Sequence, residues 1–317
     1  MKLSAGYKYS LFLVSAIAAV VLCTLPFLAV KKDILYVYTE QSTPSVEEQG
    51  FIRELRRVGI SVIINEQVKP EKKGYALWFK NPDYVAKISD SLALENFLYT
   101  KAYYPFDWKT IKNPPIVLTP YRQIYEHYMR SNIKSAIMNL GIDTSIFYQK
   151  NTQKRYPLVY SGDNNQNSLI TEYLRKHTTA LFLGTFWPKD YPHLSVEDSL
   201  PKGRAKALSQ AQRVVVYHEE NSPESKRIPL EVMEATACGA LVFSSYNKAV
   251  EETYQDNVIF YTDTNDLKLK LAQPFDENKA IKAQRITTEK LSSAASAKRF
   301  KELLDWIKNN QNPMPND

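Results

Sequence analysis

From residue 33 onward, the chain alternates short apolar runs with amphipathic stretches. Residues 33–40 and 60–66 have the length and the continuous apolar character of buried strands. Between them, residues 46–58 place apolar side chains at helical spacing, and Gly59 follows where a helix commonly ends. Strand–helix–strand units of this kind indicate a parallel sheet with right-handed crossovers.

The same alternation continues along most of the chain. Residues 135–147 are expected to form a short strand and a turn, and the C-terminal tail is expected to be helical with a break near Pro274. Further strands are predicted at 74–79, 114–120, 157–163, 180–186, 213–219, 239–245 and 257–262. Further helices are predicted at 82–99, 121–131, 167–176, 203–211, 229–238 and 247–255.

These elements fall into two successive sets with a hinge near residues 145–156. The sequence therefore predicts an α/β fold of two Rossmann-like lobes, with a ligand site in the cleft at the carboxyl ends of the strands. The expected division is 1–32 for an N-terminal tail and anchor, 33–150 and 151–305 for the two lobes, and 306–317 for a polar tail.

Residues 11–30 carry no charged side chain. Twenty helical residues extend about 30 Å, which is the thickness of the hydrocarbon core of a bilayer. A cleaved signal peptide is the alternative, but the length of the run and the poor small-residue spacing before Lys31 favour an uncleaved transmembrane helix. The chain has no N-x-S/T sequon, so we expect a single-pass membrane protein with its folded domain on the cytoplasmic face.

Composition and charge argue against several kinds of partner and site. Apolar residues make up 44% of the 317 residues and charged residues 24%, as in a globular protein. The net charge of +7 comes from scattered basic residues interspersed with acids, so we expect no nucleic-acid partner. Two cysteines and four histidines without ligand spacing predict neither a disulfide framework nor a metal site.

Residues 234–242 read Glu-Ala-Thr-Ala-Cys-Gly-Ala-Leu-Val. This run resembles the E-A-x-A-x-G-x-x-V segment of GT-B glycosyltransferases. The continuation through Glu251-Glu252 and 256–258 is similar to the group 1 transferases and especially to their CgeB-like relatives. The resemblance covers roughly residues 140–305 and is specific within 221–262. It implies a GT-B fold whose second lobe binds a nucleotide-sugar donor.

The resemblance also implies roles for single residues. Glu234 would accept two hydrogen bonds from a ribose diol, a charge-assisted pairing. Gly239 would close the helix and let helix and strand backbones approach closely. The polar loop before the helix would place backbone N–H groups beside the diphosphate of the donor.

The chain departs from the family at one motif. Members carry E-x7-E, but Lys226 occupies the position eight residues before Glu234, and the nearest acids are Glu224 and Glu231. Lys226 and Arg227 either neutralise the departing diphosphate or belong to a surface loop of mixed charge.

Gly162 and Gly184 follow two predicted strands of the second lobe and would admit close approach of a ligand. Family members often have a basic residue soon after the first of these glycines, where residues 163–166 are Asp-Asn-Asn-Gln here. Lys202 and Arg204 either compensate for that loss or are solvated loop residues.

The hinge carries a second resemblance, because residues 140–147 (Leu-Gly-Ile-Asp-Thr-Ser-Ile-Phe) are similar to the G-V-D-x-x-x-F element between the lobes of these enzymes. The first lobe lacks their Gly-rich turn and has residues 39–43 there instead. An inverting enzyme would need a general base, for which Glu40 is a weak candidate.

The expected function is transfer of a sugar from a nucleotide-diphosphate donor to an envelope glycan or a lipid-linked acceptor in polysaccharide biosynthesis, without a cofactor or an essential metal. Two alternatives stay open. One is a fucosyltransferase-like GT-B enzyme, because residues 217–222 are faintly similar to its F-E-N-S segment. The other is a catalytically inactive, membrane-anchored GT-B protein that binds or scaffolds.

Overall fold

The structure is a computed structural model that describes residues 33–39, 44–64, 74–79, 95–101, 114–150, 152–163, 168–185, 187–193, 200–218 and 227–309. The predicted anchor at 11–30, Glu40 and Lys226 lie outside these ranges. Within them, no helix combines the length and the apolar character needed to cross a bilayer.

The first lobe is built on a parallel sheet of six strands in the order β2-β1-β3-β4-β5-β6. Nearly every residue of β1, β3, β4 and β5 is buried, as expected of parallel strands covered on both faces. The strands are β1 (Ile34–Tyr38), β2 (Ser61–Ile64), β3 (Tyr75–Trp78), β4 (Glu95–Tyr99), β5 (Ile116–Thr119) and β6 (Ser135–Ile137), and the helices are α2 (Val46–Arg57) and α4 (Arg122–Arg130).

The second lobe is built on a parallel sheet of five strands in the order β11-β10-β9-β7-β8. Its strands are β7 (Tyr156–Ser161), β8 (Leu181–Leu183), β9 (Ala211–Val216), β10 (Leu241–Ser245) and β11 (Ile259–Tyr261). The later helices are α5 (Ser168–His177), α6 (Pro201–Ser209), α7 (Leu230–Ala237), α8 (Lys248–Tyr254), α9 (Thr264–Leu271), α10 (Glu277–Lys290) and α11 (Ser293–Lys308), with a short 3-10 turn, η5 (Gln255–Asn257), after α8.

One predicted element is wrong in part. Residues 82–99 were expected to be helical, but Glu95–Tyr99 form strand β4 between β3 and β5. Phe97, Leu98 and Tyr99 are buried there. Aromatic residues favour strands, and burial on both faces of the sheet removes the one-sided pattern that separates a strand from a helix. Residues 82–94 lie outside the described part of the chain.

Helix α2 follows closely from its sequence. Ser45 and Glu48 form a capping box at its start, with Ser45 Oγ accepting from the amide of Glu48 and the Glu48 carboxylate accepting from the amide of Ser45. Its apolar face buries Phe51 and Leu55. Gly59, with φ of +93°, stands just past its end as predicted.

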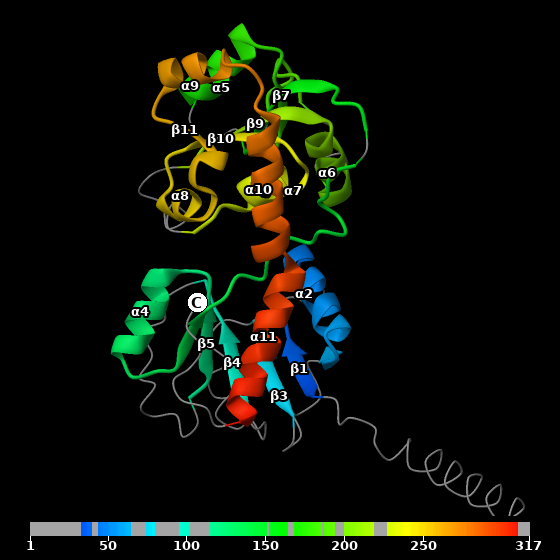
Figure 1. Cartoon of the computed structure of the whole chain (residues 1–317), viewed down its shortest axis with the longest axis vertical. Helices are drawn as coiled ribbons and strands as arrows, with labels where there is room; N and C mark the ends of the chain where they lie inside the picture. Colours follow the sequence, from blue (N-terminus) through cyan, green and yellow to red (C-terminus); the bar gives the residue numbers. More distant parts are fainter. Residues whose placement is uncertain are drawn as a thin grey trace, which may run out of the picture. The chain divides into compact units, whose positions relative to one another are not determined.

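The C-terminal helices divide between the two cores. Helix α10 packs on α7, whereas α11 packs on α2 (Figure 1). Ala297, Phe300 and Leu304 of α11 join the core of the first sheet, and the Phe300 ring meets Phe97 edge-on. Most of α11 falls in the range 151–305 predicted for the second lobe, yet its apolar side is buried against the first.

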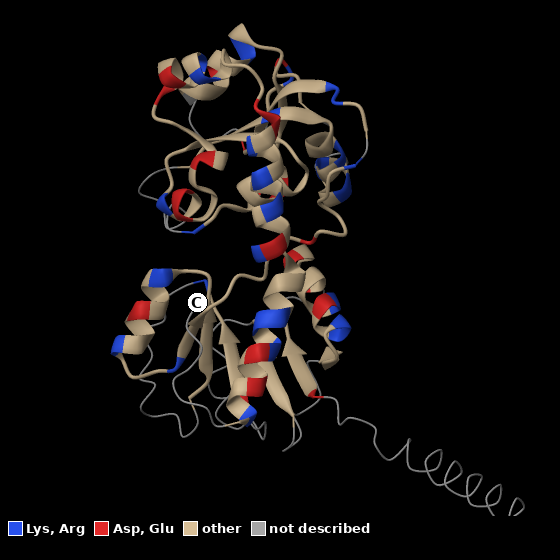
Figure 2. Ribbon diagram, in the orientation of Figure 1, with Lys and Arg blue, Asp and Glu red and all other residues tan. Residues whose placement is uncertain are grey.

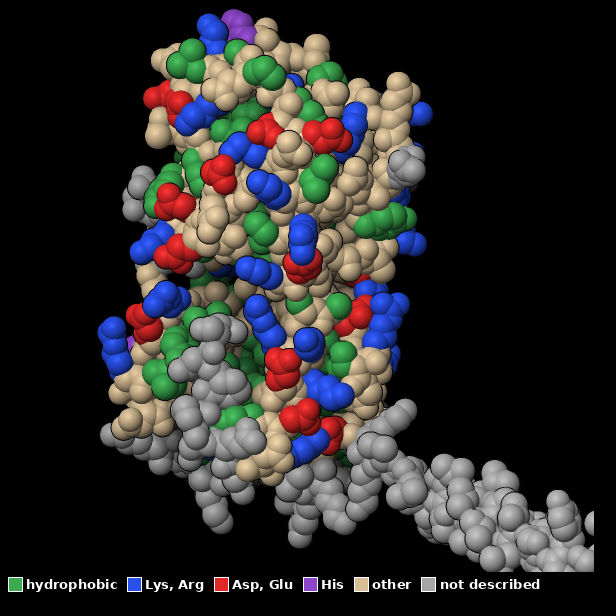
Figure 3. Space-filling model, in the orientation of Figure 1, with side chains coloured by type: hydrophobic (Ala, Val, Ile, Leu, Met, Phe, Trp, Pro, Cys, Tyr) green, Lys and Arg blue, Asp and Glu red, His purple; other side chains and the backbone are tan. Residues whose placement is uncertain are grey.

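Charges are interspersed along the described helices, as the scattered pattern in the sequence predicts. Both basic and acidic side chains occur along α10 and α11 (Figure 2). The face in Figure 3 likewise mixes both signs and shows no extended single-sign patch.

Candidate active site

A cavity of about 460 Å³ is lined by residues from both lobes and from the segment between them. Its volume lies within the usual range for small-molecule sites. The first lobe supplies the start of α2 and one lysine after β4. The second lobe supplies the residues that follow β7 and the N-terminal parts of α6 and α7. The lining residues are Ser45, Val46, Glu47, Lys101, Ile142, Asp143, Phe147, Gly162, Asp163, Pro201, Arg204, Leu230, Glu231 and Glu234.

Glu234 is the acidic residue that the sequence motif singles out, and it lines this cavity. It projects from α7, a helix whose small and apolar residues are almost wholly buried, and it is itself only 5% exposed. Its Oε2 accepts a hydrogen bond from Nε of Arg204. Within the described residues no hydrogen bond reaches Oε1, so that oxygen can accept one from a ligand in the cavity.

Arg204 comes from α6 and is also largely buried, with 16% of its side chain exposed. Its Nη2 donates to Oγ of Ser161, the last residue of β7, at 2.8 Å. Arg204 therefore ties the end of a central strand to the carboxylate on α7. The sequence left the role of Arg204 open, because nothing local to residues 200–211 shows its partner. Helix α6 begins at Pro201, two residues before the predicted start, and proline is favoured at a first helical position.

The pair is electrostatically unusual. Burial raises the pKa of Glu234 to about 7, although the positive charge and the hydrogen bond of Arg204 act to lower it. Burial acts to lower the pKa of Arg204, but attraction to Glu234 and Glu231 leaves it above its ordinary value. The guanidinium thus stays charged, and Glu234 is a carboxyl whose proton can exchange near neutral pH.

Gly162, Asp163 and Glu231 line the cavity at the ends of β7 and at the start of α7. Gly184 stands behind them, since a Cβ on it would lie 2.1 Å from the carbonyl oxygen of Gly162. Asp163 accepts hydrogen bonds from the amide and the hydroxyl of Thr185 at 2.7 and 2.8 Å. The strand ends are therefore held together beside the cavity, and Gly184 makes that close approach possible.

Two other predicted residues stand away from the lining. Gly239, with φ of +73°, closes α7: its amide donates to Thr236 and the amide of Ala240 donates to Ala235, the two bonds of a Schellman motif. Arg227 lies with its guanidinium 5.7 Å from the centre of the Tyr121 ring, and its carbonyl accepts from Asn247.

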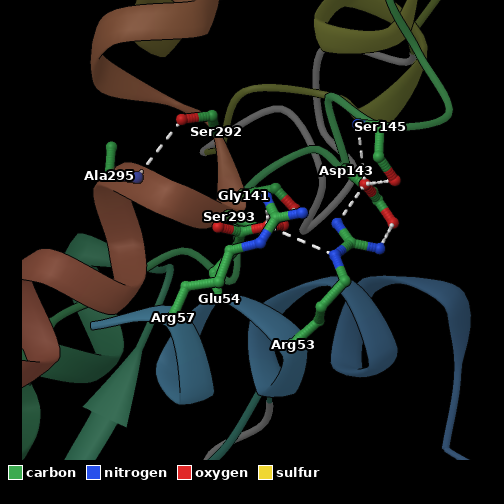
Figure 4. A network of polar contacts seen from close by, with 9 residues as sticks. All are labelled: Arg53, Glu54, Arg57, Gly141, Asp143, Ser145, Ser292, Ser293 and Ala295. Atoms are coloured by element: carbon green, nitrogen blue, oxygen red, sulfur yellow. Dashed lines mark hydrogen bonds and ion pairs between the residues drawn. The ribbon is translucent and has the colours of Figure 1, made fainter. Parts of the chain in front are cut away.

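The segment between the lobes is anchored to α2 and to the start of α11 (Figure 4). Asp143 accepts two hydrogen bonds from Arg53, at 2.6 and 2.9 Å, and two more from Ser145. Although burial acts against it, these bonds hold the pKa of Asp143 below its ordinary value. The G-I-D element thus fixes the chain crossing rather than presenting a free carboxylate.

A second crossing of the chain runs beside the first. The amide of Ile142 donates to the carbonyl of Leu291, and the amide of Ser293 donates to the carbonyl of Ile142. Gly141 has φ of +76°, and a Cβ there would lie 2.4 Å from the carbonyl carbon of Ser292. Glycine is therefore required at this position by both conformation and space.

The first-lobe side of the cavity was missed by sequence reasoning. Ser45, Val46 and Glu47 at the start of α2 and Lys101 after β4 form it. Nζ of Lys101 lies 3.2 Å from Oε2 of Glu47. The capping box at Ser45 marks a helix start after a strand, which is where sites in parallel sheets form, and it is the signal that pointed there.

The described lining carries five carboxylates and two cations. Three of the carboxylates pair with a base: Glu47 with Lys101, Asp143 with Arg53, and Glu234 with Arg204. Among the described residues, no three His, Cys, Asp or Glu side chains gather in a geometry that would hold a metal ion.

Comparison with known proteins adds to this geometry. Residues 166–305, which include β8 to β11 and α7, match the model of a family described as glycosyl transferase-like. No curated protein sequence matches the chain.

Solved structures resemble most of the chain. Sucrose-phosphate synthase from Thermosynechococcus elongatus aligns with a TM-score of 0.61 and 11% identity, over 88% of this chain and all of that one. HepE of Anabaena, solved in complex with UDP-glucose, aligns with a TM-score of 0.57 and 10% identity, over 86% and 99% of the two chains. An alpha1,3-fucosyltransferase aligns with a TM-score of 0.54 and 8% identity, over 91% and 93%.

The two parallel sheets and these neighbours establish a GT-B α/β fold, as the sequence predicted. The family match within the second lobe supports glycosyl transfer.

Proposed function

We propose that this protein is a glycosyltransferase that takes its sugar from a nucleotide-diphosphate donor bound in the cavity beside α7. The acceptor is an envelope glycan or a lipid-linked saccharide, and residues 11–30 anchor the enzyme to the membrane with its lobes on the cytoplasmic side. No metal is required in this mechanism.

The observation that carries the proposal is the position of Glu234. It is a nearly buried carboxylate that lines the cavity, inside the region that matches a glycosyl transferase-like family. A buried acid costs folding free energy unless it is paired. Retaining it beside a cavity, with one oxygen open, is what binding of a hydroxyl donor requires.

Glu234 and Arg204 would bind the donor together. A ribose hydroxyl donates to Oε1 of Glu234, while Arg204 keeps the other oxygen fixed. Arg204, whose charge is persistent, also offsets the charge of the nearby diphosphate as the glycosidic bond breaks. Catalysis then comes mainly from orienting donor and acceptor in one cavity and from stabilising the leaving group.

The first test is a thermal-shift screen of the full chain with UDP, GDP and CMP. A ligand that binds the folded state raises the melting temperature, by an amount that grows with concentration above Kd. Glu234→Ala should abolish the shift, and Glu252→Ala, an exposed glutamate on α8, should leave it intact. Absence of a shift with every nucleotide for the wild-type chain would refute the proposal.

A second candidate is a protein with this fold that binds without catalysing. The excess of carboxylates over cations in the described lining favours it, because few cations are present to stabilise the charge that develops on a departing diphosphate. Release of UDP from UDP-glucose, and from a panel of other nucleotide sugars, separates the two. Turnover above the rate of a heat-inactivated sample supports the enzyme, and binding without turnover supports the alternative.

A further inference from the structure

We propose that Glu47 is the general base of the transfer reaction, taking the proton of the acceptor hydroxyl. This inference rests on the proposed function, because it needs a donor sugar in the cavity. It replaces Glu40, the sequence-based candidate, which lies outside the described residues, with a carboxylate whose surroundings are defined.

The position of Glu47 is fixed by the start of α2. The capping box of Ser45 and Glu48 orders the first helical turn, and Ser45, Val46 and Glu47 all line the cavity. Lys101, which follows β4, pairs with Oε2 of Glu47 at 3.2 Å. No hydrogen bond from a described residue reaches the other oxygen, Oε1, and about a quarter of the side chain is exposed (24%). One oxygen is therefore held in place while the other is open to a hydroxyl.

The other carboxylates of the described lining belong to the second lobe or to the segment between the lobes. Both oxygens of Asp143 accept from Arg53, and Asp163 accepts from the amide and hydroxyl of Thr185. Glu234 is bound to Arg204, and Glu231 lies on α7, the same helix as Glu234. Glu47 is thus the lining carboxylate that the first lobe contributes with an uncommitted oxygen.

Glu47 and Glu234 face a common space. The negative charge of Glu47 is one of the causes that raise the pKa of Glu234. The two carboxylates therefore interact electrostatically, although they come from different lobes. With the nucleoside held at Glu234, the sugar of the donor extends within a cavity of about 460 Å³ toward the remaining wall, where Glu47 and Lys101 lie. In the complex we infer, a hydroxyl bound beside Glu47 attacks the sugar from the side opposite the diphosphate.

The reaction balances without a further reagent. Oε1 of Glu47 takes the proton of the acceptor hydroxyl as its oxygen forms a bond to the anomeric carbon. The bond between that carbon and the diphosphate oxygen breaks, and the electron pair leaves with the nucleoside diphosphate. A single displacement of this kind inverts the anomeric configuration. Lys101 is a positioning residue, because it orients the carboxylate through Oε2.

The test compares Glu47→Gln with Glu48→Gln in the full chain. Both remove one negative charge from the first turn of α2, and glutamine at position 48 preserves the capping box. UDP-glucose is the probe with water as the acceptor, followed by the donor panel described above. We expect Glu47→Gln to lower kcat by about 10²- to 10⁴-fold, the usual contribution of a general base, while donor binding is retained. Glu48→Gln should retain wild-type kcat.

Two further readouts separate a base from a structural residue. Formate should partly restore turnover to Glu47→Ala, because a small carboxylate can occupy the vacated space and accept the proton. The glucose first released from UDP-glucose should have the β configuration by proton NMR.

Each of the remaining outcomes overturns either the role of Glu47 or the proposed function. Wild-type kcat in Glu47→Gln, or release of the α anomer, overturns the inference and leaves donor binding intact. Donor binding without turnover by the wild-type chain overturns it as well, because there is then no transfer to catalyse. Failure of the wild-type chain to bind any nucleotide refutes the proposed function itself.

Discussion

Donor binding should depend on pH through Glu234. Burial raises the pKa of this carboxyl to about 7, from an ordinary value of 4.5. The ribose hydroxyl needs an acceptor at Oε1, and the ionised carboxylate is a stronger acceptor than the protonated acid. Lowering the pH therefore weakens binding, because the proton must be released before the donor binds.

The size of the effect follows from that pKa. Well below pH 7, affinity should fall tenfold for each unit of pH, since each pKa unit corresponds to about 1.4 kcal/mol. Between about pH 7.5 and pH 5.5 the ionised fraction falls from roughly three quarters to about 3%, so Kd should rise ~25-fold, or ~2 kcal/mol.

The measurement is isothermal titration calorimetry with UDP-glucose across this range. UDP-glucose is preferable to UDP because its diphosphate does not titrate there. Glu234→Gln should bind more weakly at pH 7.5 and show no pH dependence. A flat profile in the wild-type chain, or an equal slope in Glu234→Gln, would show that ionisation of Glu234 does not control donor binding.

The same group affects stability in the opposite direction. Because its pKa is higher in the folded protein than in the unfolded chain, Glu234 binds a proton more readily when folded. In the absence of ligand, its contribution to the free energy of unfolding should be greatest below about pH 4.5 and be lost as the pH rises through about 7. Urea denaturation of the wild-type chain and of Glu234→Gln isolates this contribution as the pH-dependent difference between them.

Two predictions concern the chain crossing. Arg53→Met should lower the free energy of unfolding by about 1–2 kcal/mol at pH 7. This is less than for a fully buried ion pair, because 36% of the Arg53 side chain is exposed. The loss should shrink as acid protonates Asp143, because the pKa of that carboxyl is depressed in the folded protein. Arg57→Met, with 65% of its side chain exposed, should change the urea unfolding free energy by less than about 0.5 kcal/mol, and equal losses in the two variants would contradict this account. Gly141→Ala should be destabilised by at least ~2 kcal/mol more than Gly59→Ala in the same assay: both glycines have positive φ, but a Cβ meets backbone only at position 141. Similar melting temperatures for these two variants would show that the crossing tolerates the added carbon.

Much of the fold can be predicted from the sequence, because each helix or strand depends largely on a pattern within its own residues. The apolar spacing of residues 46–58 predicts a helix, and Gly59 follows its end. The alternation of strands and helices implies parallel sheets, and both sheets are parallel throughout. Residues 82–99 show where local pattern fails, since β4 is buried on both faces and so carries no one-sided period.

The second lobe and its central acid also came from sequence, because E-A-x-A-x-G joins a helix, its closing glycine and the next strand within nine residues. The structure confirms that helix and its closing glycine, and Glu234 lines the cavity. The binding roles assigned to the motif stay predictions, as does the membrane anchor.

What tertiary structure decided is which distant side chains meet. Arg204 pairs with Glu234 across 30 positions, Arg53 holds Asp143 across 90, and Glu47 meets Lys101 across 54. Sequence shows charged residues at each of these positions without showing the partner. Pairing of this kind depends on strand order and on helix packing, which bring separate segments together and are not encoded in the spacing of any one segment. The sequence predicted most of the described elements and singled out one acid, and the packing of α2, α6 and α7 places that acid on a cavity.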